Sequence, residues 1–425
     1  MLNLLKKPQA VPFITFAGIK IPRESEMKHF MTVGATGSGK SVAIREALGG
    51  AAWRGDRCFV ADPDGGYLSR FYNKERGDII LNPFDARTHV WDMLAEAPTD
   101  PQADQLVESL MPIMGGAGEV GWTVRARTLL SSIFRMSREN PNADNALIYR
   151  QFAQAPTEAL SSLLGSTAAA PLLAEGAEKL LAGVRGTCTA TISILEYISK
   201  MGEGPKFSIV EWARSDSRAW VFLPYRADQI AALRYMISTW MRLAIFAQMS
   251  RGEGDFATWF VADELDALGK MEGIDDALQR VRKFGGRCIL GFQTIEKIRD
   301  IYGSGVAAAM VENCANRLIL RCAAGGHNST ANWASELIGQ VQYWKYGSTS
   351  GKNRRLGGGG SSGVTESVNK SVVTEMAVMP AQIEQLPEFG SGYFKTPSDP
   401  RWYRLSYEYD SFRKQNTEPF VAMTA

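Results

Sequence analysis

Apolar runs of strand length recur in two separated parts of the chain and predict one parallel sheet. Short runs rich in β-branched and aromatic residues occur at 13–16, 30–33, 58–61 and 79–81, and a helical pattern covers 42–53. This alternation of strand and helix is typical of an α/β layer. Further runs of strand length, which indicate that the second part of the chain completes the same sheet, occur at 218–223, 258–262, 287–292 and 317–322.

The stretch between these two parts has a helical pattern throughout. Apolar residues such as Leu106, Leu110, Leu129 and Ile133 recur at helical spacing, and similar segments follow up to residue 198. No strand signal of comparable strength interrupts them. The sequence therefore predicts an all-α domain at 95–203, inserted into an α/β domain that is formed by residues 1–94 and 204–425.

A Gly/Ser-rich stretch at 347–363 has a composition that cannot form a packed core. We expect it to be a flexible loop, and its part at 357–363 has the composition of a linker, native or engineered. Short alternating runs with prolines at 372–409 predict edge strands that return to the sheet.

Composition narrows the class of protein without identifying a partner. The 47 basic and 45 acidic residues give no overall basic field that would point to nucleic acid, although a local basic channel is compatible with this balance. The five cysteines are scattered and never spaced as CxxC, which argues against a disulfide framework or zinc site and favours a reducing cytoplasm. We expect structural roles for His29, His89 and His327.

The N-terminus has no long apolar run, and the apolar stretch at 231–249 contains two arginines. We therefore expect a soluble chain in which residues 231–249 form a buried helix.

A phosphate-binding motif follows the second predicted strand and precedes a helical run that begins at Val42. It fits the pattern GxxxxGK[ST] with the residues Gly34, Ala35, Thr36, Gly37, Ser38, Gly39, Lys40 and Ser41. In such a loop the backbone N–H groups surround the phosphates, Lys40 reaches the β/γ oxygens and the Ser41 hydroxyl binds magnesium. The sequence therefore predicts a P-loop NTPase that binds ATP with Mg²⁺ and hydrolyses it.

Two adjacent acids end the apolar strand at 258–262. Asp263 is expected to hold Mg²⁺ through water, and Glu264 to polarise the attacking water. The alternative is a charge pair at the N-terminus of a helix. The long separation between Lys40 and Asp263 leaves room for an inserted domain, which agrees with the helical block found independently.

Two other polar residues follow strands of the same predicted sheet. Gln293 comes after the strand at 287–292, where it would face the γ-phosphate as a sensor unless it is a solvated loop residue. Asp62 precedes Pro63, and it either positions a catalytic water or Lys40 or makes a plain Asp-Pro turn.

A basic stretch at 279–287 offers an arginine that could act across a subunit boundary. Arginines supplied by a neighbour complete the site in other nucleotide hydrolases, and Arg282 is our first candidate, before Arg280 and Arg287. The alternative is a solvated basic helix end beside its own carbonyl groups.

Together these motifs resemble the conjugative coupling proteins of type IV secretion systems, the TrwB/TraD-type family. The resemblance covers nearly the whole chain in order and includes the late phrase VMPAQI at 378–383. It implies a RecA-like domain interrupted by an all-α domain, a homo-hexamer, and an N-terminal anchor in the inner membrane. It also implies the residue roles given above for Lys40, Ser41, Asp263, Glu264 and Gln293, and a trans-acting role for Arg282.

The anchor of that family is missing here, so we expect a truncated soluble form or the cytosolic part of a longer protein, at the cytoplasmic face of the membrane. The run at 357–363 departs from the family pattern. The resemblance implies an ATPase, stimulated by DNA, that links a DNA–relaxase complex to the secretion channel and drives single-stranded DNA transfer. The alternatives are a double-stranded DNA translocase of the FtsK/HerA kind and a nucleotide-switched substrate receptor that pumps no DNA.

Overall fold

The computed structural model describes residues 13–113, 117–202, 204–254, 256–323, 325–326, 329–352, 364–408 and 415–423. The strands are β1 Ile14–Phe16, β2 Ile19–Ile21, β3 Phe30–Val33, β4 Arg57–Pro63, β5 Ile79–Ile80, β6 Val90–Trp91, β7 Lys206–Phe207, β8 Val221–Tyr225, β9 Thr258–Ala262, β10 Gly286–Phe292, β11 Asn316–Leu320, β12 Gln340–Lys352, β13 Val364–Met376, β14 Ser391–Thr396 and β15 Asp399–Ser406. The helices are α1 Arg23–Glu26, α2 Lys40–Arg54, α3 Leu68–Phe71, α4 Met93–Glu96, α5 Asp100–Leu110, α6 Ala117–Ser137, α7 Asn145–Tyr149, α8 Thr157–Leu164, α9 Glu178–Thr187, α10 Thr189–Ser199, α11 Ile209–Arg214, α12 Ile230–Gln248, α13 Ile274–Val281, α14 Ile295–Tyr302, α15 Ser304–Asn313, α16 Thr330–Ile338 and α17 Pro380–Glu384.

A nine-stranded sheet forms the body, in the order β15-β14-β11-β3-β10-β9-β4-β8-β5. The strands from β11 to β5 are parallel to their neighbours, whereas β14 and β15 are antiparallel edge strands. β3, β9 and β10 are buried along their whole length because helices cover both faces of the sheet. Most of the predicted strands are thus confirmed, including the edge strands β14 and β15. The run at 13–16 is an exception: Ala17 and Gly18 reverse the chain at positive φ, so β1 pairs antiparallel with β2 outside this sheet. Residues 372–376 likewise pair with β12 and not with the sheet.

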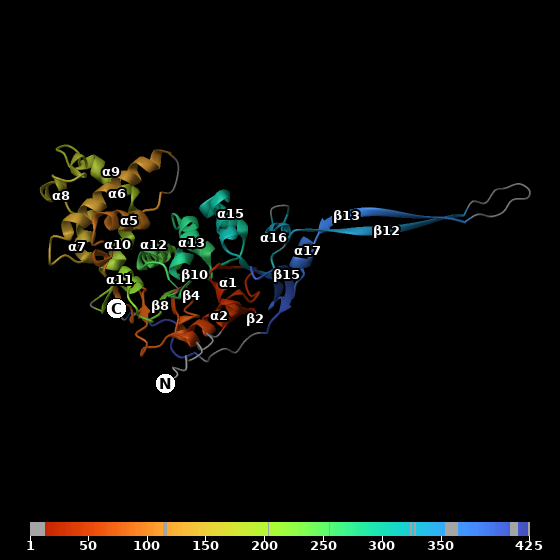
Figure 1. Cartoon of the computed structure of the whole chain (residues 1–425). Helices are drawn as coiled ribbons and strands as arrows, with labels where there is room; N and C mark the ends of the chain where they lie inside the picture. The colour runs from red at the N-terminus through yellow and green to blue at the C-terminus, as the bar shows by residue number, and fades with distance from the viewer. Residues whose placement is uncertain are drawn as a thin grey trace, which may run out of the picture.

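Alternate residues of each strand point to opposite faces of the sheet and into two separate cores. Phe30 packs into the core under α2 and the β1–β2 hairpin, while its neighbour Met31 packs into the larger core under α12 and α13. Figure 1 shows these helices on the two sides of the sheet. Because the strands from β11 to β5 are parallel, their carboxyl ends lie at one common edge of the sheet.

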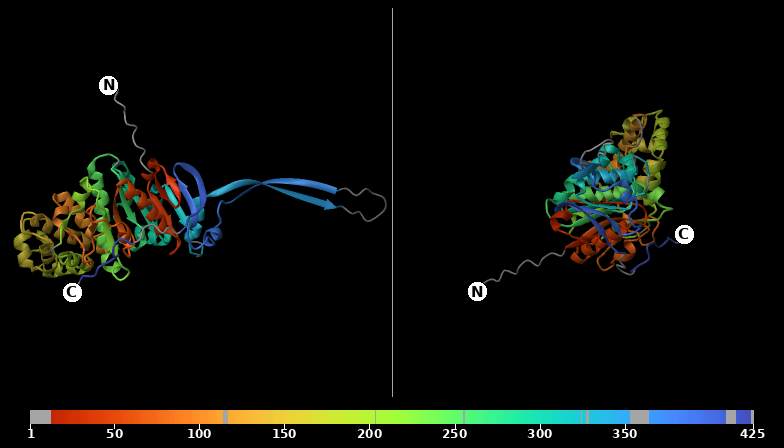
Figure 2. Two further views of the ribbon diagram at one scale, coloured as in Figure 1. Left: turned by 90° about the horizontal axis from the view of Figure 1, so that it is seen from below. Right: turned by 90° about the vertical axis from the view of Figure 1, so that its right-hand side faces the viewer.

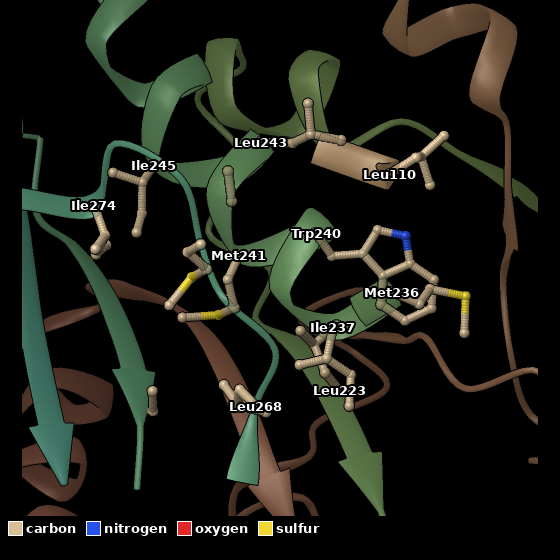
Figure 3. Packing of buried hydrophobic residues seen from close by; sticks show 14 of the residues in the cluster. Leu110, Leu223, Met236, Ile237, Trp240, Met241, Leu243, Ile245, Leu268 and Ile274 are labelled. Carbon is tan, nitrogen blue, oxygen red and sulfur yellow. The ribbon is translucent and has the colours of Figure 1, made fainter. Parts of the chain in front are cut away.

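Between β6 and β7 the described chain forms helices α4 to α10, a lobe at one end of the molecule (Figure 1). The helix α12 joins this lobe to the sheet: Trp240 and its neighbours lie between Leu110 of α5 and Leu223 of β8 (Figure 3). The ring of Trp240 also meets Trp91 edge-on, with centroids 5.6 Å apart. The lobe and the sheet therefore share one continuous core, and the exact domain boundaries at 94/95 and 203/204 stay predictions.

The segment Ile230–Arg251 is the one helical stretch of the described chain that is long and apolar enough to span a membrane. In its most apolar stretch of 18 residues, 67% is buried inside the protein, which is typical of a core helix. The expectation of a buried helix at this place is met by α12.

The Gly/Ser-rich stretch departs from the expectation of a flexible loop. Residues 347–352 belong to β12, which pairs with β13 through thirteen antiparallel residue pairs, from Gln340 with Met376 to Lys352 with Val364. Their Gly and Ser residues have little β propensity of their own, so the ladder to β13 determines their conformation. The other part of the predicted loop, 353–363, including the run at 357–363, lies outside the described residues. Figure 2 shows that the β12–β13 hairpin extends far from the body, opposite the helical lobe.

Candidate nucleotide-binding site

The P-loop leaves the carboxyl end of β3, between β10 and β11. The Gly34 N–H donates to the Phe292 carbonyl (3.4 Å), and the Ala35 N–H donates to the Arg321 carbonyl (2.7 Å), so both neighbouring strands hold the start of the loop. The loop ends where α2 begins at Lys40. An N-terminus of a fifteen-residue helix presents unpaired N–H groups and a positive dipole end, which together favour a phosphate group.

Lys40 and Ser41 point toward the end of β9. The Lys40 ammonium donates to the carbonyl oxygens of Gly34 (2.6 Å) and Ala35 (3.2 Å). Burial lowers the pKa of Lys40, although the carboxylates of Asp263 and Glu264 oppose that shift. The Ser41 hydroxyl donates to Asp263 Oδ2 at 2.5 Å, which brings together the two residues predicted to bind the metal.

Asp263 is held by a partner that the sequence did not suggest. The Tyr67 hydroxyl, at the start of α3, also donates to Asp263 Oδ2 (2.8 Å). The other oxygen, Asp263 Oδ1, is buried and has no hydrogen-bond partner among the described residues, and the same holds for the Ser38 hydroxyl. Buried polar atoms are rarely left unpaired. The free Asp263 Oδ1, on the carboxylate that Ser41 contacts, is a hard oxygen donor of the kind that Mg²⁺ prefers, so Ser41 and Asp263 fit the metal.

Glu264 follows Asp263 and lies half-buried on the wall of the same cavity. Burial raises the pKa of the Glu264 carboxyl, the negative charges of Asp263 and Asp266 raise it further, and the nearby Lys40 opposes the rise. A carboxylate whose pKa is moved toward neutrality is better suited to accept a proton from water than an ordinary surface glutamate.

A cavity of about 320 Å³ collects these groups. Gln293 lies on its wall, as expected for a residue at the carboxyl end of β10, and Arg45 and Phe389 complete it. Neither Arg45 nor Phe389 belongs to a motif that the sequence analysis selected. Its full lining is Thr36, Gly37, Gly39, Lys40, Ser41, Val42, Arg45, Asp263, Glu264, Gln293 and Phe389.

The P-loop is braced by residues from the opposite end of the chain. Gly39 has a φ of 109°, and a Cβ at this position would lie 2.9 Å from the Tyr407 hydroxyl oxygen, so only glycine fits. The Tyr407 hydroxyl donates to the Gly39 carbonyl (3.1 Å), and the Gly390 N–H donates to the Ser38 carbonyl (3.0 Å). The edge strands β14 and β15 thus fix the last turn of the loop, and they place Phe389 at the mouth of the cavity.

Asp62 and His29 have structural partners. The Asp62 carboxylate accepts the N–H groups of Tyr67 (2.9 Å) and Leu68 (2.6 Å), which makes it part of the turn that starts α3. Burial nevertheless raises the pKa of Asp62 to about 7. His29 Nδ1 accepts the Cys288 N–H (3.0 Å), and its Nε2 lies 2.7 Å from the Leu278 carbonyl. Both therefore serve the fold, whereas His327 lies outside the described residues.

Arg282 lies far from the P-loop of its own chain. It is exposed in the turn Arg282–Phe284, which precedes β10, while Gln293 follows the other end of that strand. Seven strand residues at ~3.3 Å each separate the two edges of the sheet by roughly 20 Å. Arg282 therefore cannot reach its own nucleotide site, and its position is compatible with an action on a second subunit and also with a solvated basic helix end.

Comparison with known proteins shows to which family this chain belongs. The type IV secretion-system coupling protein DNA-binding domain family matches residues 13–406. Coupling protein TraD of Escherichia coli (strain K12) is 30% identical over 349 residues, which are 81% of this chain and 48% of TraD. The chain thus spans about half the length of that relative.

Solved structures of the plasmid coupling protein TrwB share the whole fold. TrwB in complex with ADP and Mg²⁺ is 26% identical with a TM-score of 0.81, covering 98% of this chain and 94% of TrwB. TrwB with the non-hydrolysable ATP analogue ADPNP is 27% identical with a TM-score of 0.83 over the same shares of 98% and 94%. The predicted RecA-like α/β fold, interrupted by an all-α domain, is confirmed. The chain belongs to the family of type IV secretion-system coupling proteins.

Proposed function

We propose that this chain is an ATP-hydrolysing motor that links a DNA–relaxase complex to a type IV secretion channel and drives the transfer of single-stranded DNA. The observation that carries the proposal is the Ser41–Asp263 contact of 2.5 Å beside Lys40, at the carboxyl edge of the sheet. This arrangement joins the P-loop to a second acidic strand, which hydrolysis by this class of enzymes requires. The membership of the coupling protein family supports the choice of DNA as the cargo.

The residues predicted from the sequence to form the site have the following roles in this proposal. The loop of residues 34–42 surrounds the phosphates of ATP through N–H groups that follow Ala35, and the Lys40 ammonium leaves its two carbonyl partners to bind the β/γ oxygens. Mg²⁺, which bridges phosphate oxygens and neutralises their charge when bound, is held by Ser41 and Asp263. Glu264 accepts a proton from the attacking water, and Gln293 contacts the γ-phosphate position.

The subunits act as a homo-hexamer in which Arg282 faces the nucleotide of the neighbour. Its exposure and its place at the amino edge of the sheet support this role, because a head-to-tail ring is able to bring that edge against the carboxyl edge of a neighbouring subunit. A guanidinium supplied in this way stabilises charge in the transition state. Tethering at the cytoplasmic face of the inner membrane, and contacts with the relaxase and the secretion components, follow from the family in this proposal.

Steady-state ATP turnover tests the function when it is measured with single-stranded DNA, with duplex DNA of equal length, and without DNA. We expect the largest stimulation with the single strand. Stimulation by duplex only would support a double-stranded DNA translocase of the FtsK/HerA kind. Turnover that no DNA changes would support a nucleotide-switched receptor and would contradict the proposed motor.

A further inference from the structure

The β12–β13 hairpin is built from two strands of thirteen residues, and no third strand of the described residues pairs with it. Its strand β13 contacts α16 at the base of the hairpin, and the left view of Figure 2 shows the described part of both strands extending clear of the rest of the described chain. Isolated two-stranded hairpins are at best marginally stable in water. An arm of this length is therefore expected to gain stability from something that it binds.

Exposed apolar side chains are concentrated on this arm. Six of the eleven large hydrophobic side chains that are exposed in the described chain belong to it, and they are Val341, Tyr343, Trp344, Tyr346, Val368 and Val372. Single exposed apolar residues are ordinary, but a contiguous group indicates a binding surface.

One face of the hairpin carries two aromatic rings that lie close to a lysine ammonium group. Trp344 pairs with Val372 and Tyr346 pairs with Lys370, so these four side chains share a face, which we call the Trp344 face. The Lys370 ammonium lies 3.9 Å from the centre of the Trp344 ring and 5.9 Å from that of Tyr346. Even so, Trp344 is 54% exposed and Tyr346 is 65% exposed. On the opposite face the Tyr343 hydroxyl is bonded to Glu375.

The charge of the arm selects the class of partner. The two described strands, 340–352 and 364–376, contain three basic and two acidic residues, a net charge of +1, and Lys370 is the charged member of the Trp344 face. A second copy would bring its own Lys370 to a contact between two such faces, and like charges disfavour that contact. A polyanion is complementary instead, and its bases would cover the rings.

We propose that the Trp344 face binds single-stranded nucleic acid, with bases stacked on Trp344 and Tyr346 and with Lys370 at a phosphate. The inference rests on the proposed DNA motor and names residues that contact its cargo. Aromatic side chains interleaved with lysines form the stacking platforms of proteins that bind single strands without sequence preference. A duplex is a poor partner, because its bases are already stacked and present no free ring faces.

Fluorescence anisotropy with a labelled oligo-dT single strand tests the proposal on the full chain. The double variant Trp344→Ala/Tyr346→Ala should bind about 10- to 100-fold more weakly, since each stacked base is worth about a factor of ten. Trp53→Ala is the matched control, because Trp53 is an exposed tryptophan (72%) on α2, far along the chain from the hairpin. The double variant Trp344→Phe/Tyr346→Phe should keep most of the affinity, because the rings remain.

A second signature comes from salt. Lys370→Gln should make the slope of log affinity against log salt concentration shallower by about 0.7, the value for one phosphate contact on a single strand. ATP turnover without DNA should equal that of the wild type in every hairpin variant, which shows that each one is folded.

The outcomes separate this inference from the proposed function. Wild-type affinity in the alanine double variant, or equal losses in the alanine and phenylalanine variants, would overturn the inference while the DNA-stimulated turnover of the wild type still stood. A changed sedimentation coefficient with unchanged DNA affinity would also overturn it, because the face would then join subunits. A wild-type chain that binds no single strand at all would overturn the proposed motor itself.

Discussion

Replacing Glu264 by glutamine separates hydrolysis from nucleotide binding. The amide has the shape of the carboxyl but cannot accept a proton from water, while Asp263 and Ser41 keep their contact of 2.5 Å. Removing a general base costs typically 10²- to 10⁴-fold in rate, which is about 2.7–5.5 kcal/mol of barrier. Glu264→Gln should therefore slow ATP turnover by that factor and leave the affinity for a fluorescent ATP analogue unchanged.

The pH dependence gives this prediction a second readout. In the wild type, turnover should rise with pH as Glu264 loses its proton, and this rise should lie above pH 4.5 because burial and the charges of Asp263 and Asp266 raise the pKa of Glu264. Asp266→Asn is the matched control: removing that negative charge lowers the pKa of Glu264, so the acid limb should move to lower pH while turnover at the optimum is kept. In Glu264→Gln the acid limb should disappear.

Two results would refute this reasoning. If Glu264→Gln lost nucleotide affinity while Asp263→Asn kept full turnover, the roles of the two acids would be reversed. If the acid limb survived unchanged in Glu264→Gln, the titrating group would be a different residue.

Four other perturbations follow from the same structure. Lys40→Thr should abolish hydrolysis, because the ammonium that binds the β/γ oxygens is lost, and near-normal turnover would remove the P-loop assignment. Arg282→Ala should be nearly inactive alone and regain turnover when mixed with Lys40→Thr chains; no rescue under conditions of subunit exchange would place Arg282 in a structural role. Tyr407→Phe should weaken binding of the ATP analogue by at most about tenfold, the worth of one hydrogen bond to the Gly39 carbonyl at 3.1 Å; an unchanged affinity would show that the brace is dispensable. Burial lowers the pKa of His29 to about 4, so neutral His29 contributes to stability above pH 6.5 and this contribution is lost as the pH falls toward 4. His29→Asn should therefore lose less thermal stability than the wild type between pH 6.5 and about 4. An unchanged profile of stability against pH would contradict this.

The parts of the fold that depend on local pattern were predictable from the sequence. β3, β9 and β10 are continuous apolar runs because both of their faces are buried, and that signal is strong. The P-loop is likewise a local motif whose spacing is fixed by one turn of backbone around a phosphate.

Features that join distant segments were not predictable in the same way. Tyr407 contacts Gly39 and Tyr67 contacts Asp263 because the strand order brings their segments together. That order cannot be deduced from the pattern of a single sequence. The strand at residues 347–352 was missed for a related reason: its glycines and serines have no β preference, and its pairing with β13 overrides their local tendency.

Movement along DNA is the central claim, and displacement of streptavidin from a biotinylated single strand measures it directly. With ATP and Mg²⁺ we expect the wild-type chain to remove streptavidin from the single strand faster than from an equal duplex, and Glu264→Gln to bind the strand without removing it. Displacement that is independent of ATP, or equal in the wild type and Glu264→Gln, would contradict a motor driven by this site.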